Sequence, residues 1–185
     1  MDLKIARKVG DKTEEGSWYA NPANADHSLG DFKKAIEYHE LDLKMAKEVG
    51  DRAGEGKSYC NLGNAYHSVG DFKKAIEYHE LDLKIAKEVG DRAGEGKSYC
   101  ILGCAYDSPG DFKKAIEYHE LDLKIAEEVG DRAAEGMSYF NLGNAYHSLG
   151  DFKKVIECHK RHLKIAKEVG DQQSIGFAQY ALYRH

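Results

Sequence analysis

A stretch of 40 residues recurs along this chain. Residues 51–90 read DRAGEGKSYCNLGNAYHSVG followed by DFKKAIEYHELDLKIAKEVG, and they recur at 91–130 with five changes. The same unit recurs at 131–170 and, more weakly, at 11–50, while residues 2–10 repeat the end of its second half. A fixed period of this length with two helical halves is the signature of a solenoid, in which each unit buries its apolar face against its neighbours.

Each unit is expected to form two helices. In the second half, apolar residues recur at three- and four-residue spacing and predict a helix over about 72–88: Phe72, Ala75, Ile76, His79, Leu83 and Ala86. In the first half, a similar stripe predicts a helix over about 52–68: Tyr59, Leu62, Ala65, Tyr66 and Val69. Gly63 lies within that stripe, where its missing side chain would let the partner helix approach closely.

The junctions between these helices carry glycine followed by aspartate. Gly70 and Gly90 are expected to end one helix, and Asp71 and Asp91 to cap the next. Such short connections make consecutive helices antiparallel. The chain is therefore predicted to be a single array over 1–185: a partial second helix at 2–10, repeats at 11–50, 51–90, 91–130 and 131–170, and a final first helix at 171–185.

Two prolines and one tyrosine interrupt the pattern. Pro22 stands at the position of Leu62, and because proline breaks a helical hydrogen bond, the first helix of repeat 11–50 is expected to be kinked there. Pro109 should disturb its helix less, since it lies where that helix already ends. Tyr183 occupies the position of Gly63 in the final helix, which should block a further repeat from packing in the same way.

Composition and charge narrow the classes of partner. The 185 residues carry 27 Lys and Arg against 32 Asp and Glu, a net charge of −5 with both signs interspersed, so no basic face indicates nucleic acid binding. No apolar run approaches the ~18 residues that a membrane span needs. The four cysteines lie inside helical patterns, which favours reduced thiols and a cytoplasmic protein. Met1 begins within a repeat, so we expect a piece of a longer array and no signal peptide.

The motif Tyr59-x2-Leu62-Gly63-x2-Tyr66, followed by Ala75-x3-His79, resembles the tetratricopeptide repeat (TPR) consensus. The unit departs from it in having 40 residues rather than about 34 and in lacking the closing proline. The longer unit, with N-L-G-N and G-D-R-x-x-E-G, resembles the repeats of the LGN/Pins cell-polarity adaptors. The resemblance implies an all-α fold, a TPR α-solenoid in which antiparallel helix pairs wind into a right-handed superhelix.

The resemblance also implies a binding surface, because the first helices of TPR arrays line a concave groove. The residues of these helices that are left facing the groove include Lys57, Asn61, Asn64, His67, Lys97, Cys100, Cys104, Asn141, Asn144 and His147. By analogy with related adaptors, Asn64 and Asn144 would hold the backbone of an extended peptide, while Lys57 and Lys97 meet its acidic residues. The alternative is that these are ordinary solvated polar residues on surface helices.

Other motifs favour no catalytic or metal site. The sequence GEGKS at 54–58 resembles a phosphate-binding loop, but Asp51 stands where that loop needs glycine. Cys100 and Cys104 lie one helical turn apart, yet a zinc site needs three or four ligands and only Cys60 could add one. No Ser/His/Asp or paired-carboxylate arrangement stands out from the repeats, so we expect no enzyme activity, no cofactor and no metal.

Histidine recurs every 40 residues at one core position, as His39, His79, His119 and His159. This recurrence is typical of structural residues, whose ring nitrogens need partners, so acid is expected to loosen the array.

Two functions fit these observations. The first is a protein-binding scaffold whose groove takes an extended, acidic peptide from a protein partner. The second is an architectural array with no dedicated ligand in this stretch, which self-associates through its ends because near-identical units fit one another.

Overall fold

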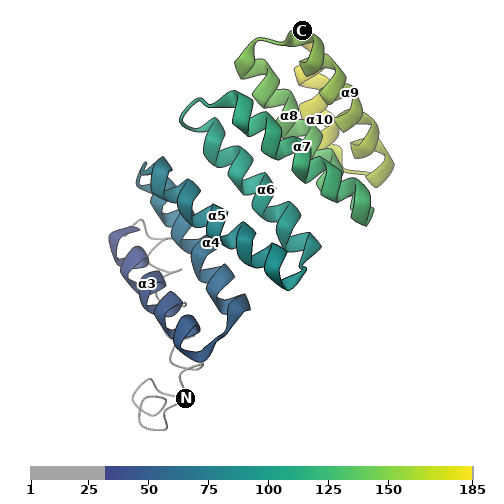
Figure 1. Cartoon of the computed structure of the whole chain (residues 1–185). Helices are drawn as coiled ribbons and strands as arrows, with labels where there is room; N and C mark the ends of the chain where they lie inside the picture. Colours follow the sequence, from purple (N-terminus) through teal and green to yellow (C-terminus); the bar gives the residue numbers. More distant parts are fainter. Residues whose placement is uncertain (1–31, 185) are drawn as a thin grey trace. The chain divides into compact units, whose positions relative to one another are not determined.

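The computed structural model describes residues 32–184, which form eight α-helices and no strand (Figure 1). The helices are α3 (Phe32–Val49), α4 (Arg52–Ser68), α5 (Phe72–Val89), α6 (Arg92–Asp107), α7 (Phe112–Val129), α8 (Arg132–Leu149), α9 (Phe152–Val169) and α10 (Gln172–Tyr183). The predicted helices over 52–68 and 72–88 are confirmed, the second being one residue longer. The predicted partial helix at 2–10, the first half of repeat 11–50 and the kink at Pro22 lie outside the described residues.

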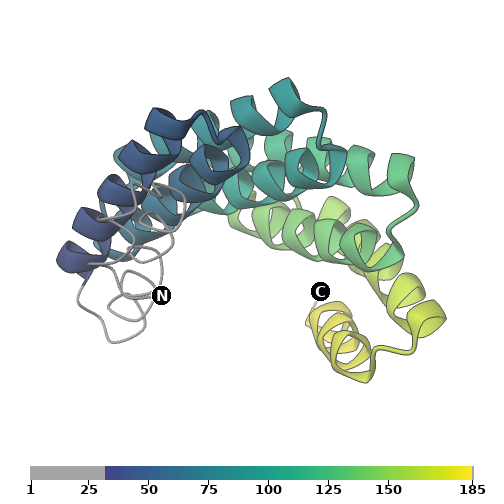
Figure 2. The ribbon, with the colours of Figure 1, turned by 90° about the horizontal axis from the view of Figure 1, so that it is seen from below.

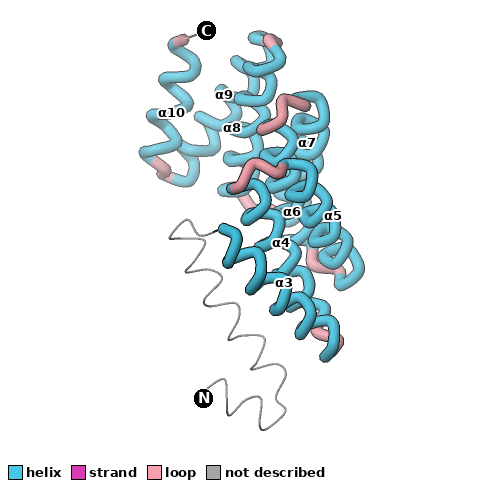
Figure 3. The backbone as a smooth tube through the Cα atoms, turned by 90° about the vertical axis from the view of Figure 1, so that its left-hand side faces the viewer, coloured by secondary structure: helices cyan, strands magenta, loops and turns pink. Residues whose placement is uncertain are grey.

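The helices belong to two compact units that meet between Gly90 and Asp91, a boundary between two predicted repeats. Helix α4 packs against α3 and α5 in the first unit, and α6 to α10 pack in sequence in the second. Consecutive helices within a unit run antiparallel, separated by turns of two to four residues (Figure 3). Helix α10, drawn in yellow in Figure 2, follows α9 at the end of the second unit and packs against it. The single array over 1–185 stays a prediction.

Each turn is built from the glycine–aspartate pair. Gly90 adopts a left-handed φ of 71° and ends α5, and six other junction glycines have φ between 73° and 89°. The next residue, Asp91, caps α6 by accepting a hydrogen bond from the Gly94 N–H at 2.9 Å. A cap of this kind stabilises a helix by about 1 kcal/mol. Gly–Asp pairs 20 residues apart thus separate successive helices from α3 to α10.

Pro109 shortens one helix. Helix α6 ends at Asp107, whereas α8 continues to Leu149, the residue equivalent to Pro109. Helix α4, which has Val69 at this position, ends at Ser68, so α6 is only one residue shorter at this end than α4, and Ser108 keeps a helical φ of −59° and ψ of −46°. The prediction of a mild effect is confirmed.

An arginine ties the two helices of each repeat together. Arg52, the first residue of α4, pairs with Glu55 one turn later and with Glu88 near the end of α5. The same arrangement recurs with Arg92, Glu95 and Glu128, and with Arg132, Glu135 and Glu168. Exposed ion pairs contribute little stability, so we interpret this arrangement as fixing how the start of one helix meets the end of the next. It explains the G-D-R-x-x-E-G motif.

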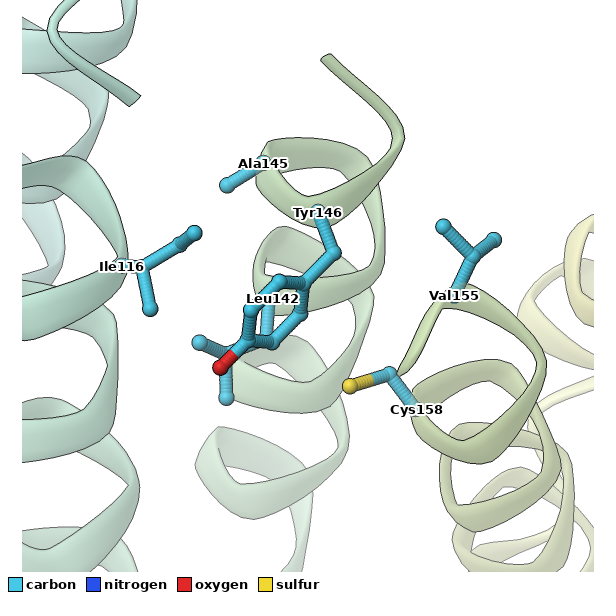
Figure 4. Close-up of a cluster of buried hydrophobic side chains, with 6 residues drawn as sticks. All are labelled: Ile116, Leu142, Ala145, Tyr146, Val155 and Cys158. Atoms are coloured by element: carbon cyan, nitrogen blue, oxygen red, sulfur yellow. The ribbon is translucent and has the colours of Figure 1, made fainter. Parts of the chain in front are cut away.

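The core of the second unit lies between successive helices. Figure 4 shows Leu142 and Tyr146 of α8 between Ile116 of α7 and the side chains of Val155 and Cys158 on α9. These side chains are 1–8% exposed, with Val155 at 1%. Helix α8 therefore packs on both sides, as solenoid packing requires.

Glycine and histidine make a close helix–helix contact in three of the pairs, α4 with α5, α6 with α7 and α8 with α9. A Cβ added to Gly63 would lie 2.4 Å from the His79 imidazole, and one added to Gly103 would lie 2.3 Å from that of His119. Gly143 and His159 repeat the contact at 2.7 Å. The prediction that Gly63 permits a close approach is confirmed.

We predict that Gly103→Ala destabilises the protein by about 1–3 kcal/mol, the usual cost of overpacking a core. The His119 imidazole is only 2% exposed and would lie 2.3 Å from the added Cβ, a clash that we expect to outweigh the ~1 kcal/mol that alanine gains in helix propensity. Urea unfolding followed by circular dichroism measures the change.

The matched control is Gly176→Ala in α10, where an added Cβ meets nothing within 4 Å. This variant should gain about 0.5–1 kcal/mol, because only the propensity effect remains. Equal effects of the two substitutions would contradict the role of the glycine–histidine contact.

Candidate functional site

The ten residues predicted to form the binding site lie on α4, α6 and α8, and none of them is buried. We call their side of α6 and α8, both in the second unit, the groove face. Six of the ten are exposed and four are half-buried: Lys57, Asn64, Lys97, Cys104, Asn144 and His147 among the first, and Asn61, His67, Cys100 and Asn141 among the second. Their accessibility fits a binding surface and equally a solvated one.

A pocket of about 280 Å³ opens between α6, α7 and α8. Lys97, Cys100 and Met137 line it from the groove face, and Ile125 and Ala126 line it from α7. Gly96 also lines the pocket and adds no side chain to it. A Cβ at this position would lie 2.9 Å from the Ile125 side chain. A smaller pocket of about 130 Å³ lies at the equivalent place between α8, α9 and α10. The walls are mainly aliphatic, so this kind of site suits an apolar group.

A buried aspartate also lines the larger pocket and was missed by the sequence analysis. Asp122 is 6% exposed and accepts a hydrogen bond from the Ser138 hydroxyl at 2.7 Å. Burial raises the pKa of its carboxyl. Asp42 and Ser58 form the same bond at 2.7 Å in the first unit.

A sequence signal for this pair existed. Asp and Ser recur 16 residues apart in successive repeats, and both change together at the end of the chain, where His162 and Ala178 take their places. Because Ala178 cannot donate a hydrogen bond, an aspartate at 162 would be buried without that partner.

Three predicted site residues come together around Cys100. Asn141 on α8 donates its amide N–H to the Cys100 sulfur at 3.5 Å, and Cys104 lies one turn along α6. The hydrogen bond from Cys100 lowers the pKa of the Cys104 thiol, and the same bond, together with burial, raises the pKa of Cys100.

A third pocket, of about 210 Å³, also lies between α8, α9 and α10. Asn144 and His147 line it together with Phe140, whose ring centroid is 6.4 Å from that of Phe177. The remaining lining residues are His159, Tyr180, Ala181 and Arg184. The Arg184 guanidinium lies 5.9 Å from the centre of the Tyr180 ring. This pocket combines aromatic walls with one cation.

The sequence analysis missed the α10 side of this pocket. Phe177, Tyr180 and Arg184 stand 120 residues after Lys57, Cys60 and Asn64, so they occupy the same repeat positions as predicted groove residues. Aligning the final helix with the first helices of the repeats would have identified these residues.

The predicted residues of α4 share a face and line none of these three pockets. The Asn64 amide N–H points to the Cys60 sulfur at 3.9 Å, and the His67 ring packs edge-on against Phe72 at 5.3 Å.

The recurring histidines are buried among the helices. His79 is 1% and His119 is 2% exposed, and burial lowers the pKa of each to about 4. Among residues 32–184, no group of three or more His, Cys, Asp or Glu side chains could hold a metal ion. The GEGKS stretches lie within α4 and α6, as predicted. None of the helices in the described part combines the length and apolar character that crossing a bilayer requires.

The tetratricopeptide repeat profiles match residues 14–81, 56–128 and 137–168. These matches cover more than half of the chain, which therefore belongs to the tetratricopeptide repeat family. No curated protein sequence matches it.

Solved structures show the same fold. BtubC from P. vanneervenii is 24% identical with a TM-score of 0.78, over 91% of this chain and 78% of BtubC. A STAND protein with a tetratricopeptide repeat sensor from Pyrococcus horikoshii is 22% identical with a TM-score of 0.87, over 97% of this chain and 28% of that one. A Rap protein complexed with Competence and Sporulation Factor is 19% identical with a TM-score of 0.78, and the match covers 94% of this chain and 48% of the Rap protein. The predicted all-α TPR solenoid class is confirmed.

We predict that the protein loses stability as the pH falls from 6.5 to about 4. The pKa of His79 and His119 lies near 4 in the folded state against 6.5 ordinarily, so the unfolded chain binds protons first. Their stabilising effect is complete above pH 6.5 and is lost progressively down to pH 4, at about 3 kcal/mol for each histidine. The raised pKa of Asp42 and Asp122 opposes part of this loss, because their protonation favours the folded state.

Urea unfolding at several pH values isolates the histidine contribution. The double variant His79→Gln/His119→Gln should show a much flatter profile than the original chain, while His147→Gln, at an exposed position, should leave the profile unchanged. A double variant with the original pH profile would contradict the prediction.

Proposed function

We propose that this chain is a protein-interaction scaffold that binds an extended, acidic peptide segment along the groove face. Repeats of this family generally mediate interactions between proteins, and a Rap protein of the same fold was solved with Competence and Sporulation Factor. The observation that carries the proposal is that a cation lies beside apolar walls in each of the two larger pockets, Lys97 in one and Arg184 in the other. The carboxyl groups of Asp122 and Asp131 also line the first of these pockets.

The size of the pockets favours a peptide over a metabolite. Their volumes of about 280 and 210 Å³ fall below the ~300 Å³ at which small-molecule sites begin. Each suits one apolar side chain of a longer ligand. The two pockets border α8, which would place two anchor side chains along one segment of peptide.

Polar side chains between the pockets suit a peptide backbone. Asn144 lines the aromatic pocket, and its amide can both donate to and accept from a peptide bond. Asn64 is also exposed on α4 and lies two helical turns after Lys57 on the same face. The exposed ammonium groups of Lys57 and Lys97 would meet carboxylates of the ligand. As in the sequence analysis, the likeness to LGN/Pins adaptors, a cytoplasmic location and the absence of enzyme activity and cofactors belong to this proposal.

End-to-end association is a second candidate. Tyr183 at the end of α10 is 91% exposed, and Phe177 and Tyr180 are 53% and 63% exposed. Large exposed aromatic side chains on a terminal helix favour contact with another chain.

Light scattering over a range of protein concentrations tests this candidate. A rise in mass that Tyr183→Ser abolishes would support association through α10. A constant monomer mass at all concentrations would exclude it.

We predict that the chain binds fluorescein-labelled twelve-residue peptides that contain several Glu or Asp and two Leu or Phe, as measured by fluorescence anisotropy. Lys97→Glu should weaken the tightest of these peptides about 5- to 10-fold, because it replaces an attraction with a repulsion beside the pocket. A higher salt concentration should also weaken binding, because it screens the attraction between the charges.

The matched control is Lys113→Glu, an equal charge reversal at an exposed position on the second helix of the same pair. It should change affinity less than twofold. Binding unaffected by Lys97→Glu and Asn144→Ala, or no binding above that of uncharged peptides, would contradict the proposed function.

A further inference from the structure

The 280 Å³ pocket between α6, α7 and α8 contains a buried acceptor that the proposed function does not use. Asp122 of α7 lines this pocket although its side chain is only 6% exposed. One carboxyl oxygen, Oδ2, accepts a hydrogen bond from the Ser138 hydroxyl at 2.7 Å. The other oxygen, Oδ1, lies 3.7 Å from the place that a Cβ on Gly96 would occupy. Because Gly96 lines the pocket and has no side chain, it leaves Oδ1 uncovered on that side.

The Asp122 carboxyl has acceptor positions to spare. Burial raises its pKa, while the Ser138 hydroxyl and the neighbouring Cys100 thiol lower it. An ionised carboxylate accepts about four hydrogen bonds, more than these two donors supply. A purely apolar group in the pocket would remove water from the remaining positions without replacing its hydrogen bonds, which costs free energy. A ligand group that donates a hydrogen bond avoids this cost.

The rest of the pocket suits the body of an apolar group. Ile125, Ala126 and Val129 of α7 line it together with Met137 of α8, which is 52% exposed. A methionine thioether packs favourably against an aromatic ring. A tyrosine side chain combines such a ring with a hydroxyl at its tip, and a buried tyrosine hydroxyl usually has a hydrogen-bond partner.

The charges around the pocket favour a neutral donor over a cation. Lys97 lines the pocket, and its ammonium would repel a lysine or arginine of the ligand. Asp131, a second carboxyl in the lining, accepts a hydrogen bond from the Ala134 N–H at 3.0 Å at the start of α8, where the helix dipole favours its negative charge. The Lys97 ammonium therefore balances the one carboxylate that remains, Asp122.

We propose that Asp122 makes this pocket selective for a tyrosine side chain of the bound peptide, whose hydroxyl donates a hydrogen bond to Asp122 Oδ1 while its ring contacts Ile125 and Met137. The inference rests on the proposed function and adds the identity of one anchor residue. Phenylalanine and leucine fit the same walls, but they lack the donor and bind more weakly. The equivalent pocket of 130 Å³ has His162 at the position of Asp122, so we expect no such selectivity there.

The test starts from the tightest acidic peptide identified for the proposed function. Each of its two apolar anchors is replaced in turn by tyrosine, phenylalanine, leucine or lysine, and the affinity for the full chain is measured by fluorescence anisotropy. At one of the two positions, tyrosine should bind about 10-fold more tightly than phenylalanine, which is the usual effect of a hydrogen bond to a charged group.

Equal binding of tyrosine and phenylalanine at both positions, or tighter binding of lysine, would overturn this inference and leave the proposed function intact. If none of the acidic peptides binds, the proposed function fails and this inference fails with it.

Removal of the carboxyl tests the role of Asp122. Asp122→Ala should reduce the preference for tyrosine over phenylalanine to less than about threefold. Ser138 keeps a partner in this variant, because its hydroxyl also lies 2.9 Å from the Ala134 carbonyl oxygen. Asp122→Asn keeps the size of the side chain without its charge, so it should also reduce the preference, and it replaces the alanine variant if that variant does not fold.

The matched control is Asp42→Ala. It removes the same kind of bond, which Asp42 accepts from Ser58 at 2.7 Å, at a residue that does not line the pocket. This control should keep the full preference for tyrosine. An undiminished preference in the Asp122 variants, with the helical circular dichroism preserved, would overturn the role of Asp122.

Discussion

The contact between a glycine on the first helix and a buried histidine on the second sets the spacing within each helix pair. At Gly63 and Gly103 the imidazole fills the volume that a Cβ would take, so the two helices approach more closely than any other residue would allow. The histidine stays neutral, because burial lowers its pKa to about 4, and it therefore behaves as a polar core residue. The first helix is held against the second through this glycine, so the contact also fixes the place of the predicted binding residue that follows it, Asn64 after Gly63 and Cys104 after Gly103.

The turns supply the second constraint. A left-handed glycine and an aspartate cap recur every 20 residues, and they fix both where each helix ends and where the next begins. Because these pairs keep a constant interval, the same repeat positions lie on the same face of each first helix, even where Pro109 shortens α6. Some repeat positions therefore differ between repeats without changing the helix pairs. Asn64, for example, is replaced by Cys104 in the next repeat, and Cys60 by Phe140 in the one after, which changes the chemistry of that face.

Much of the fold could be predicted from the sequence, because local signals determine it. Periodicity and the Gly–Asp pairs located α4 and α5 within a residue, and the role of Gly63 followed from its place in an apolar stripe. The buried residues and the pockets of the site were not predicted. The sequence analysis did not single out Asp122, and the packing of α7 against α8 shows that it is buried beside Ser138. The aromatic pocket was missed because α10 diverges from the repeat, which hid the equivalence of Arg184 and Asn64.

The central claim is that the groove face, with its two pockets, is where this protein holds its partner. A crystal structure of the chain with an acidic, Leu- or Phe-containing peptide tests it most directly. Our account predicts peptide density along α6, α8 and α10, with apolar side chains in the two pockets and carboxylates near Lys97 and Arg184. Peptide density on the outer sides of α7 and α9, with both pockets empty, would contradict it.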